Sequence, residues 1–385
     1  MHCCRTTRLA TAAIALCAAL VQPSIALPAT RGASTPPLLS GADWMGAIAP
    51  LLGPLPLNRI VMPGTHDSAS YSIPPLGSPA PKPAGSLSPE VFDPNDPLSP
   101  LVALVPQPLV QYVSVPWARA QDLSIAAQLA AGVRYLDLRV CAGPGANPEL
   151  YACHSLYGAA IRTAVLRPVA SFAAAHPGEL VILDFHRFAA PRSPAGMAPA
   201  LHQKLAAEIH AALGSRLVPP TPLGAAITFA TVLHTSGRVI VLYNDSPTVL
   251  ENPDFWPYGD MIIAWPATDS LTTLEQHVAA NLTCRCDVTH QVAPATDAFF
   301  DLQLQRTPSR ATYIQGTFGS SRMRSLRDLA SANPSVLANL TQLTPPASAS
   351  RANLNIISMD FEQIPGLLSF TEAYDRLSRT GTAAP

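Results

Sequence analysis

The chain has 385 residues, of which 48% are hydrophobic and only 13% are charged. A disordered chain would have far fewer apolar residues and a coiled coil far more charged ones, so the composition excludes both. Lys and Arg number 24 and Asp and Glu 25, which leaves no basic excess for a phosphate backbone, so nucleic acid is not an expected partner. The 41 prolines predict proline-rich surface segments around a packed core.

The first residues are typical of a secretory signal peptide. Arg5 and Arg8 precede an uncharged run from Leu9 to Val21, and the small-x-small step Ser24-Ile25-Ala26 follows. The run is shorter than the roughly 20 residues that a spanning helix needs, and an uncleaved anchor is the alternative. Secretion is therefore expected. The expected organisation is a signal peptide over 1–26, a linker over 27–45 and one folded domain over 46–380.

Four cysteines lie beyond the predicted signal peptide. In an oxidising compartment an even number favours disulfides, and a pair between Cys141 and Cys153 would close a short loop. Cys284 and Cys286, followed by an acidic residue and a histidine, leave a metal site as an alternative. One C-x-C with one His lacks the paired spacing of structural zinc sites, so no metal is expected.

Short β-branched or aromatic runs alternate with Ala- and Leu-rich stretches after residue 45. The predicted strands are 59–62, 133–140, 151–154, 180–186, 239–244, 261–265, 311–316 and 354–361, and the predicted helices are 161–175, 198–213, 271–280, 323–331 and 370–377. Continuous apolar runs such as 181–183 and 239–242 favour a parallel sheet covered on both faces. No Gly-x-Gly-x-x-Gly turn follows the first strand, so the pattern predicts a single distorted (β/α)8 TIM-type barrel of the α/β class.

A long insertion, residues 74–120, follows the first predicted strand. It is dense in Pro, Ser and Gly and becomes apolar from Leu101 to Trp117. One interpretation is a lid packed against the barrel rim. The other is peripheral membrane contact through 101–117, because Tyr112 and Trp117 belong to the residue types that favour the headgroup layer.

Polar residues end or follow five predicted strands, where the active site of a barrel is built. They are His66 and Asp67 after the first strand, Asp137 and Arg139 on the second, His154 on the third, Asp184, His186 and Arg187 on the fourth, and Asp360 on the last. These side chains are expected to converge at the end of the barrel where the strands end, which is its mouth. Asp137 is a catalytic candidate, with a structural ion pair to Arg139 as the alternative.

Two histidines and an arginine suit phosphoryl transfer. One imidazole can take the proton of an attacking hydroxyl while the other donates one to the leaving oxygen, and a pKa of ~6.5 allows both near neutral pH. Arginine is always charged, and its planar fork pairs with phosphate oxygens. A carboxylate behind the base imidazole fixes its tautomer.

The same residues resemble a known family. Pro63-Gly64-Thr65-His66-Asp67-Ser68 within 57–68, Gly132-Val133-Arg134-Tyr135-Leu136-Asp137-Leu138-Arg139 within 128–139, His154, and the run 176–183 resemble the X domain of phosphatidylinositol-specific phospholipases C. The bacterial type and the X-domain-containing proteins are the most similar branches. The resemblance covers about 50–190 well and 235–375 loosely.

The resemblance implies a two-step cleavage of phosphatidylinositol-type lipids. His66 would act as general base on the inositol 2-hydroxyl, and His154 would protonate the departing diacylglycerol oxygen. The cyclic phosphate formed would be opened slowly with the two roles reversed. Arg139 would clamp the phosphate, Asp67 would tune the charge there, and Asp360 would hold His66. A phospholipid or glycolipid substrate and a monomer are expected.

Departures from the family pattern concern the metal and the headgroup. The large eukaryotic signalling enzymes have calcium ligands here, including an acidic residue where this chain has Arg139, so metal independence is expected. Where bacterial members present a substrate-contacting lysine, this chain offers His186 or Arg187. Tyr243, Asn244 and Asp245, after the fifth strand, are candidates for binding the ring hydroxyls.

Two other functions stay open. A metal-dependent glycerophosphodiester or sphingolipid phosphodiesterase of the same barrel type would have Glu or Asp ligands near the first histidine, where Ser68-Ala69-Ser70 stands. A non-catalytic secreted glycolipid-binding module would keep the barrel without turnover.

Overall fold

The structure, a computed structural model, describes residues 41–93, 107–191, 193, 196–345, 348–361, 367–371 and 375. The predicted signal peptide, most of the predicted linker and part of the insertion lie outside these residues. The predicted helix 370–377 lies largely outside them as well. The described residues form one compact unit.

Ten strands form one sheet, and eight of them run parallel in the order β7-β6-β5-β2-β1-β10-β9-β8. The parallel strands are β1 (Met62–Thr65), β2 (Tyr135–Ala142), β5 (Val181–Ala189), β6 (Val239–Tyr243), β7 (Trp256–Pro257), β8 (Met261–Ala264), β9 (Phe299–Gln303) and β10 (Ile356–Met359). β3 (Leu150–His154) and β4 (Leu156–Ala160) extend β2 as an antiparallel hairpin. Within the described residues the edge strands β7 and β8 do not pair, so the curled sheet is an open barrel. The predicted single α/β barrel is confirmed.

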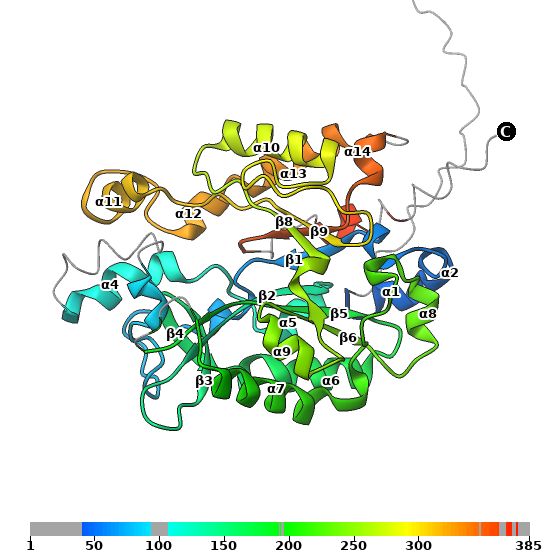
Figure 1. Ribbon diagram of the computed structural model, residues 1–385. Coiled ribbons are helices and arrows are strands. Elements are labelled where there is room, and N and C mark those ends of the chain that lie inside the picture. Colours follow the sequence, from blue (N-terminus) through cyan, green and yellow to red (C-terminus); the bar gives the residue numbers. More distant parts are fainter. Residues whose placement is uncertain are drawn as a thin grey trace, which may run out of the picture. The chain divides into compact units, whose positions relative to one another are not determined.

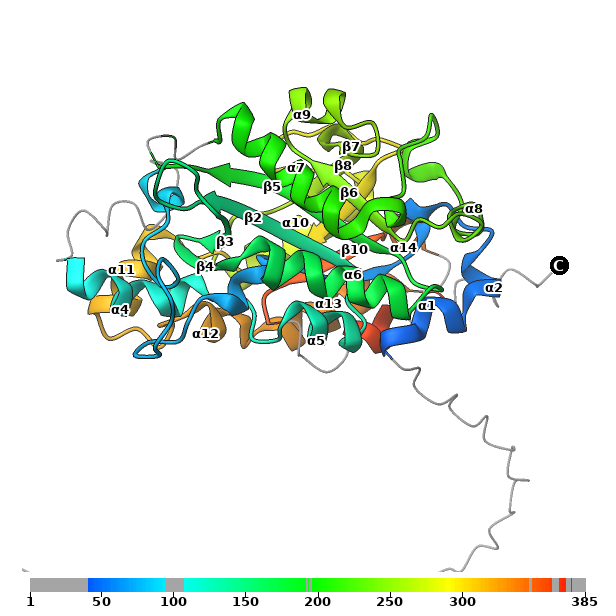
Figure 2. The same cartoon turned by 90° about the horizontal axis from the view of Figure 1, so that it is seen from below.

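Helices cover two opposite sides of the strands (Figure 1, Figure 2). One side carries α5 (Ile125–Ala131), α6 (Arg167–Ala175), α7 (Pro199–Leu213) and α9 (Ser246–Glu251), and the other carries α10 (Leu271–Cys284), α13 (Asn333–Leu343) and α14 (Ala349–Ala352). The remaining described α-helices are α1 (Trp44–Ala47), α2 (Ala49–Leu52), α4 (Gln107–Ala118), α8 (Phe229–Leu233), α11 (Arg310–Phe318) and α12 (Leu326–Ala330). None of the described helices is long and apolar enough to cross a bilayer.

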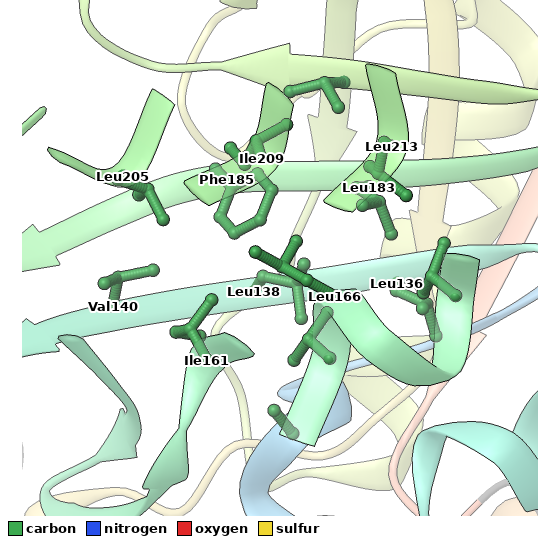
Figure 3. Packing of buried hydrophobic residues seen from close by; sticks show 14 of the residues in the cluster. Leu136, Leu138, Val140, Ile161, Leu166, Leu183, Phe185, Leu205, Ile209 and Leu213 are labelled. Atoms are coloured by element: carbon green, nitrogen blue, oxygen red, sulfur yellow. The ribbon is translucent and has the colours of Figure 1, made fainter. Parts of the chain in front are cut away.

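The alternation of side chains in the central strands separates the core from the polar interior. Leu136, Leu138 and Val140 of β2, with Leu183 and Phe185 of β5, are completely buried against the helices (Figure 3). Successive strand residues face opposite sides, so the residues between these five project into the barrel. Apolar packing on one face thus fixes the direction of the polar side chains on the other.

Two strand predictions need correction. Residues 311–316 lie in the helix α11, because the Ser309 side chain accepts the Thr312 N–H and begins a helix there. Three strands are missing from the prediction: β4, the two-residue β7, and β9, whose residues are all buried and whose polar residues interrupt the apolar run. The first strand begins at Met62, three residues later than predicted, because residues 57–59 form a 3-10 turn.

The described part of the insertion packs on the barrel rim. Val110 and Trp117 of α4 are buried against Tyr313 and Leu326. Trp117 is only 1% exposed, so it is a core residue and does not face a membrane, whereas Tyr112 is 61% exposed. The lid interpretation therefore holds for α4, and residues 101–106 lie outside the described residues.

The predicted disulfide between Cys141 and Cys153 is present and joins β2 to β3. Cys284 and Cys286 are also bonded to each other. Their sulfurs are therefore not thiolates that could hold a metal ion, and the metal alternative for this motif does not fit.

Leu138→Ala tests the packing of β2 against the helices. It should lower the free energy of unfolding by about 2–5 kcal/mol, because the lost methyl groups leave a cavity in a fully buried cluster. Leu250→Ala, at a side chain that is 85% exposed, should change it by less than about 0.5 kcal/mol. Urea unfolding followed by circular dichroism measures both, and equal effects would contradict this packing.

Candidate active site

His66 lies immediately after β1, at the mouth of the barrel. The last residues of β1 and β10 are paired, so His66 and Asp360 leave neighbouring strands at the same level. A side chain at Gly64 would place its Cβ 2.8 Å from Tyr135 Cδ1, which explains the glycine two residues before His66. His66 donates its Nδ1–H to Asp360 Oδ1 over 2.7 Å, and this bond leaves Nε2 facing the mouth.

β2 contributes Asp137 and Arg139 from the same face of the strand. Arg139 Nε lies 2.6 Å from Asp67 Oδ1, and Arg139 Nη2 lies 3.3 Å from His66 Nε2. Asp137 accepts the backbone N–H of Asp67 over 3.2 Å, and its Oδ2 lies 3.9 Å from His66 Nε2. Both strand residues therefore contact the turn that His66 and Asp67 form.

One carboxylate oxygen stands between the two imidazoles. Asp67 Oδ2 is 3.3 Å from His66 Nε2 and 3.2 Å from His154 Nε2. The ring centroids are 6.2 Å apart. His154 donates Nδ1–H to the carbonyl of Ala118 over 2.9 Å, which directs its Nε2 toward Asp67. Two imidazoles and the Arg139 guanidinium thus face one point.

The protonation states follow from burial and neighbouring charge. Burial would lower the pKa of His66, but the carboxylates of Asp67 and Asp360 raise this pKa to about 9. Burial would raise the pKa of Asp67, but the Arg139 guanidinium holds it well below its usual range. At neutral pH His66 is therefore mostly cationic. The hydrogen bond from Arg139 Nη2 needs a lone pair on His66 Nε2, so it belongs to the neutral form of the ring. Only that neutral form can accept a proton.

An irregularity in β5 brings His186 and Arg187 to the same mouth. The register with β2 shifts after Leu138, so β5 has one extra residue there and two successive side chains reach the site. His186 Nδ1 lies 3.4 Å from Asp137 Oδ1 and 3.6 Å from Asp184 Oδ2. Burial would lower the pKa of His186, but these carboxylates raise it to about 9, so the ring is cationic at neutral pH.

Sequence reasoning missed Glu90, which the insertion brings into the site. Its side chain is 1% exposed. Oε1 lies 3.2 Å from Arg139 Nη1 and 3.2 Å from Arg187 Nε, and Oε2 accepts the Ser155 N–H over 3.0 Å. A glutamate in a proline-rich segment has no spacing that relates it to β2 or β5, so the only signal was a charge in a stretch with few charges.

Two hollows meet at His66, Arg139 and Arg187. The larger is a cavity of about 360 Å³, and its other lining residues include Asp137, His186, Tyr258, Trp265 and Gln303. The smaller is about 90 Å³, and its other lining residues include His154, Gln305, Tyr313 and Asp360. Tyr258 and Gln303 were not predicted, because Tyr258 follows the two-residue strand β7 and Gln303 ends β9, which the apolar pattern does not reveal.

Of the three candidates for the ring hydroxyls, Asn244 lines this cavity, and Tyr243 and Asp245 do not. Tyr243 is fully buried on the helix side of β6, where its hydroxyl lies 2.8 Å from His202 Nδ1. Asp245 caps α9 by accepting the Thr248 N–H over 3.0 Å, and it lines a neighbouring hollow that shares His186, Arg187 and Asn244 with the cavity. Tyr243 holds an odd position of β6, like the core residues Val239 and Val241, which explains why it points away from the ring site.

One atom each of His66, Asp67 and Asp137 lies within 4.8 Å of the others, a spacing that a metal ion could bridge. Arg139 already contacts Asp67 over 2.6 Å, so a fixed positive charge balances this carboxylate. The cluster can therefore be neutralised by the protein alone. Two imidazoles around one point can transfer protons without a metal, and the guanidinium beside them can stabilise an anionic centre.

The chain is similar in sequence to proteins with a PI-PLC X domain. No family model matches the chain. The human PI-PLC X domain-containing protein 2 is 29% identical over 297 residues, which cover 77% of this chain and 87% of that protein. The mouse PI-PLC X domain-containing protein 1 is 31% identical over 222 residues, which cover 57% of this chain and 58% of that protein.

Among solved structures, the phosphatidylinositol-specific phospholipase C of Listeria monocytogenes aligns with a TM-score of 0.55 and 18% identity, covering 87% of this chain and 99% of that one. A mutant of the Staphylococcus aureus enzyme aligns with a TM-score of 0.56 and 17% identity, covering 87% and 97%. At these identities the structures establish the fold alone. Over most of its length the chain is therefore similar in sequence to PI-PLC X domain-containing proteins, and its fold is similar to that of the bacterial phosphatidylinositol-specific phospholipases C.

Proposed function

We propose that the chain is a phosphodiesterase that cleaves phosphatidylinositol-type lipids into diacylglycerol and a cyclic inositol phosphate. One observation carries the proposal. His66 Nε2 and His154 Nε2 lie 3.3 Å and 3.2 Å from the same oxygen of Asp67, and Arg139 contacts the same carboxylate. A phosphodiester at this mouth would have one imidazole for each of the two oxygens that exchange at phosphorus.

In the first step, neutral His66 accepts the proton of the inositol 2-hydroxyl at Nε2. The freed oxygen attacks phosphorus, the bond from phosphorus to the diacylglycerol oxygen breaks, and His154 Nε2–H gives that oxygen a proton. Asp360 stabilises the His66 imidazolium that forms, through the 2.7 Å bond to Nδ1. Arg139 stabilises the charge on the non-bridging phosphate oxygens.

The first step leaves each histidine in the state that the second requires. His66 is protonated and His154 is neutral, so His154 can take a proton from water while His66 returns one to the 2-oxygen. The ring opening of the cyclic phosphate is therefore the same chemistry with exchanged roles. The cavity of about 360 Å³, with His186, Arg187 and Tyr258 in its lining, is the proposed place of the inositol ring.

We also propose a metal-independent reaction and secretion of the mature chain. Arg139 supplies a fixed positive charge, which supports metal independence. The disulfide between Cys141 and Cys153 is typical of an oxidising compartment, which supports secretion. The expected monomer and the absence of a nucleic-acid partner stay predictions.

The products of phosphatidylinositol cleavage test the reaction class. With EDTA present, phosphorus NMR should detect a cyclic inositol phosphate first and the acyclic phosphate later. Reaction mixtures with and without EDTA should agree. Loss of turnover on chelation would favour the metal-dependent phosphodiesterase, and binding to liposomes without any turnover would favour the glycolipid-binding module.

His66→Ala and His154→Ala should each lower kcat at least ~10²-fold, because each variant removes a positioned acid or base. His210→Ala is the matched control, since His210 lies on the outer helix α7 and contacts Asp254 at 3.0 Å. It should keep nearly full activity. Steady-state rates on phosphatidylinositol vesicles measure all three, and a His154 variant as active as the control would contradict the assigned general acid.

Asp360→Asn should lower kcat/KM and move the ascending limb of its pH profile to lower pH. That limb reports the loss of the His66 proton, and the Asp360 carboxylate is one of the charges that raise the pKa of His66 to about 9. Removing the charge lowers that pKa, so the base becomes neutral at lower pH. A limb that stays in place or moves upward would show that Asp360 does not hold His66.

A further inference from the structure

We infer that Glu90 is a positioning residue of the active site, so the proline-rich insertion is part of the catalytic apparatus and more than a cover. The inference rests on the proposed function, because the groups that Glu90 holds are the proposed phosphate clamp and the segment that carries the proposed general acid.

The contacts of Glu90 link three elements of the mouth. Oε1 pairs with Arg139 Nη1 of β2 and Arg187 Nε of β5, each over 3.2 Å. Oε2 accepts the N–H of Ser155, the residue after His154, over 3.0 Å. One buried carboxylate thus holds two guanidinium groups side by side and fixes the backbone beside the general acid.

The turn after His154 is built like the turn after His66. Asp67 and Ser155 both have left-handed backbone conformations, with φ of 44° and 57°. Each donates its N–H to a buried carboxylate, Asp67 to Asp137 over 3.2 Å and Ser155 to Glu90 over 3.0 Å. Such conformations cost energy and persist only when surrounding contacts hold them. Glu90 therefore does for the second histidine what Asp137 does for the first.

The segment that carries Glu90 is itself fixed to the β3-β4 hairpin. The Ser88 N–H donates to the Ser155 carbonyl over 2.9 Å, and Leu87 forms a β-bridge with Leu156. Burial would raise the pKa of Glu90, but Arg139 and Arg187 lower it, so the carboxylate stays charged. Without that charge the two guanidinium groups would face each other at short range and repel.

Glu90→Gln tests the inference, and Glu179→Gln is its matched control. Glu179 is also buried and also pairs with an arginine beside β2, Arg134, over 2.6 Å. That pair lies before the beginnings of β2 and β5, at the opposite end of the strands from the mouth, where contacts serve the stability of the barrel. Glu179→Gln loses one buried ion pair away from the mouth, whereas Glu90→Gln loses its two ion pairs at the site.

The rates should be measured on phosphatidylinositol vesicles and on soluble cyclic inositol phosphate, with thermal unfolding in parallel. Glu90→Gln should lower kcat about 10- to 100-fold on both substrates, because the clamp and acid lose their orientation. KM for the soluble cyclic phosphate should stay within about threefold of wild type, since removing a negative charge does not weaken attraction of an anion. Glu179→Gln should lower the unfolding temperature with little change in kcat.

A kcat of Glu90→Gln near wild type on the cyclic phosphate would overturn the inference, and so would an equal loss of kcat in Glu179→Gln. A loss on vesicles alone would assign the insertion to lipid contact and would also overturn the inference.

Nitrogen-15 NMR of the arginine Nε–H groups tests the positioning role without any turnover. Hydrogen exchange of the Arg139 and Arg187 Nε–H groups should be faster in Glu90→Gln than in wild type. Unchanged exchange rates would overturn the positioning role of Glu90. This result would hold even if wild type cleaved neither substrate and the proposed function were wrong.

Discussion

The buried pair of Asp67 and Arg139 is the interaction on which the site depends. Asp67 is 3% exposed, and its carboxylate contacts the guanidinium over 2.6 Å. Removing a charge from water costs several kcal/mol unless partners compensate for it, so unpaired imidazoles and carboxylates could not be kept at this depth. The pair lets His66 and His154 share one anionic neighbour. It thereby fixes the geometry before any substrate binds.

Strand pairing determines which side chains meet there. The adjacency of β10, β1, β2 and β5 brings together residues that lie almost three hundred positions apart in the sequence. Gln121 joins the strand ends by donating to the carbonyls of His66 and Met359, each over 2.9 Å. The insertion then closes the site from outside with the Glu90 carboxylate and the Ala118 carbonyl. The acid and the base are therefore oriented by parts of the chain with unrelated sequence patterns.

The sequence carried enough information for the barrel and for the inward-facing groups of the long strands. His66, Arg139, His154 and Asp360 end or follow apolar runs, and parallel strands bring such positions to one mouth. The strand β9 was missed because its polar residues interrupt the apolar run, and α11 was taken for a strand because its cap was overlooked. Such errors are local and did not change the predicted fold.

The rest of the site depends on tertiary contacts that leave no local pattern. Tyr243 was placed at the ring site because it ends a strand, but the alternation of β6 turns it toward the helices. Glu90 could not be found, because the path of a proline-rich segment is set by packing against the hairpin and the rim. The extra residue in β5 that admits both His186 and Arg187 is likewise a matter of register.

A crystal structure with a non-hydrolysable phosphonate analogue of short-chain phosphatidylinositol tests the central claim most directly. The account predicts phosphonate oxygens at hydrogen-bond distance, roughly 2.7–3.2 Å, from Arg139 and His154 Nε2, with the inositol 2-hydroxyl at His66 Nε2. A phosphonate bound away from Arg139, or in contact with only one of the two imidazoles, would contradict it.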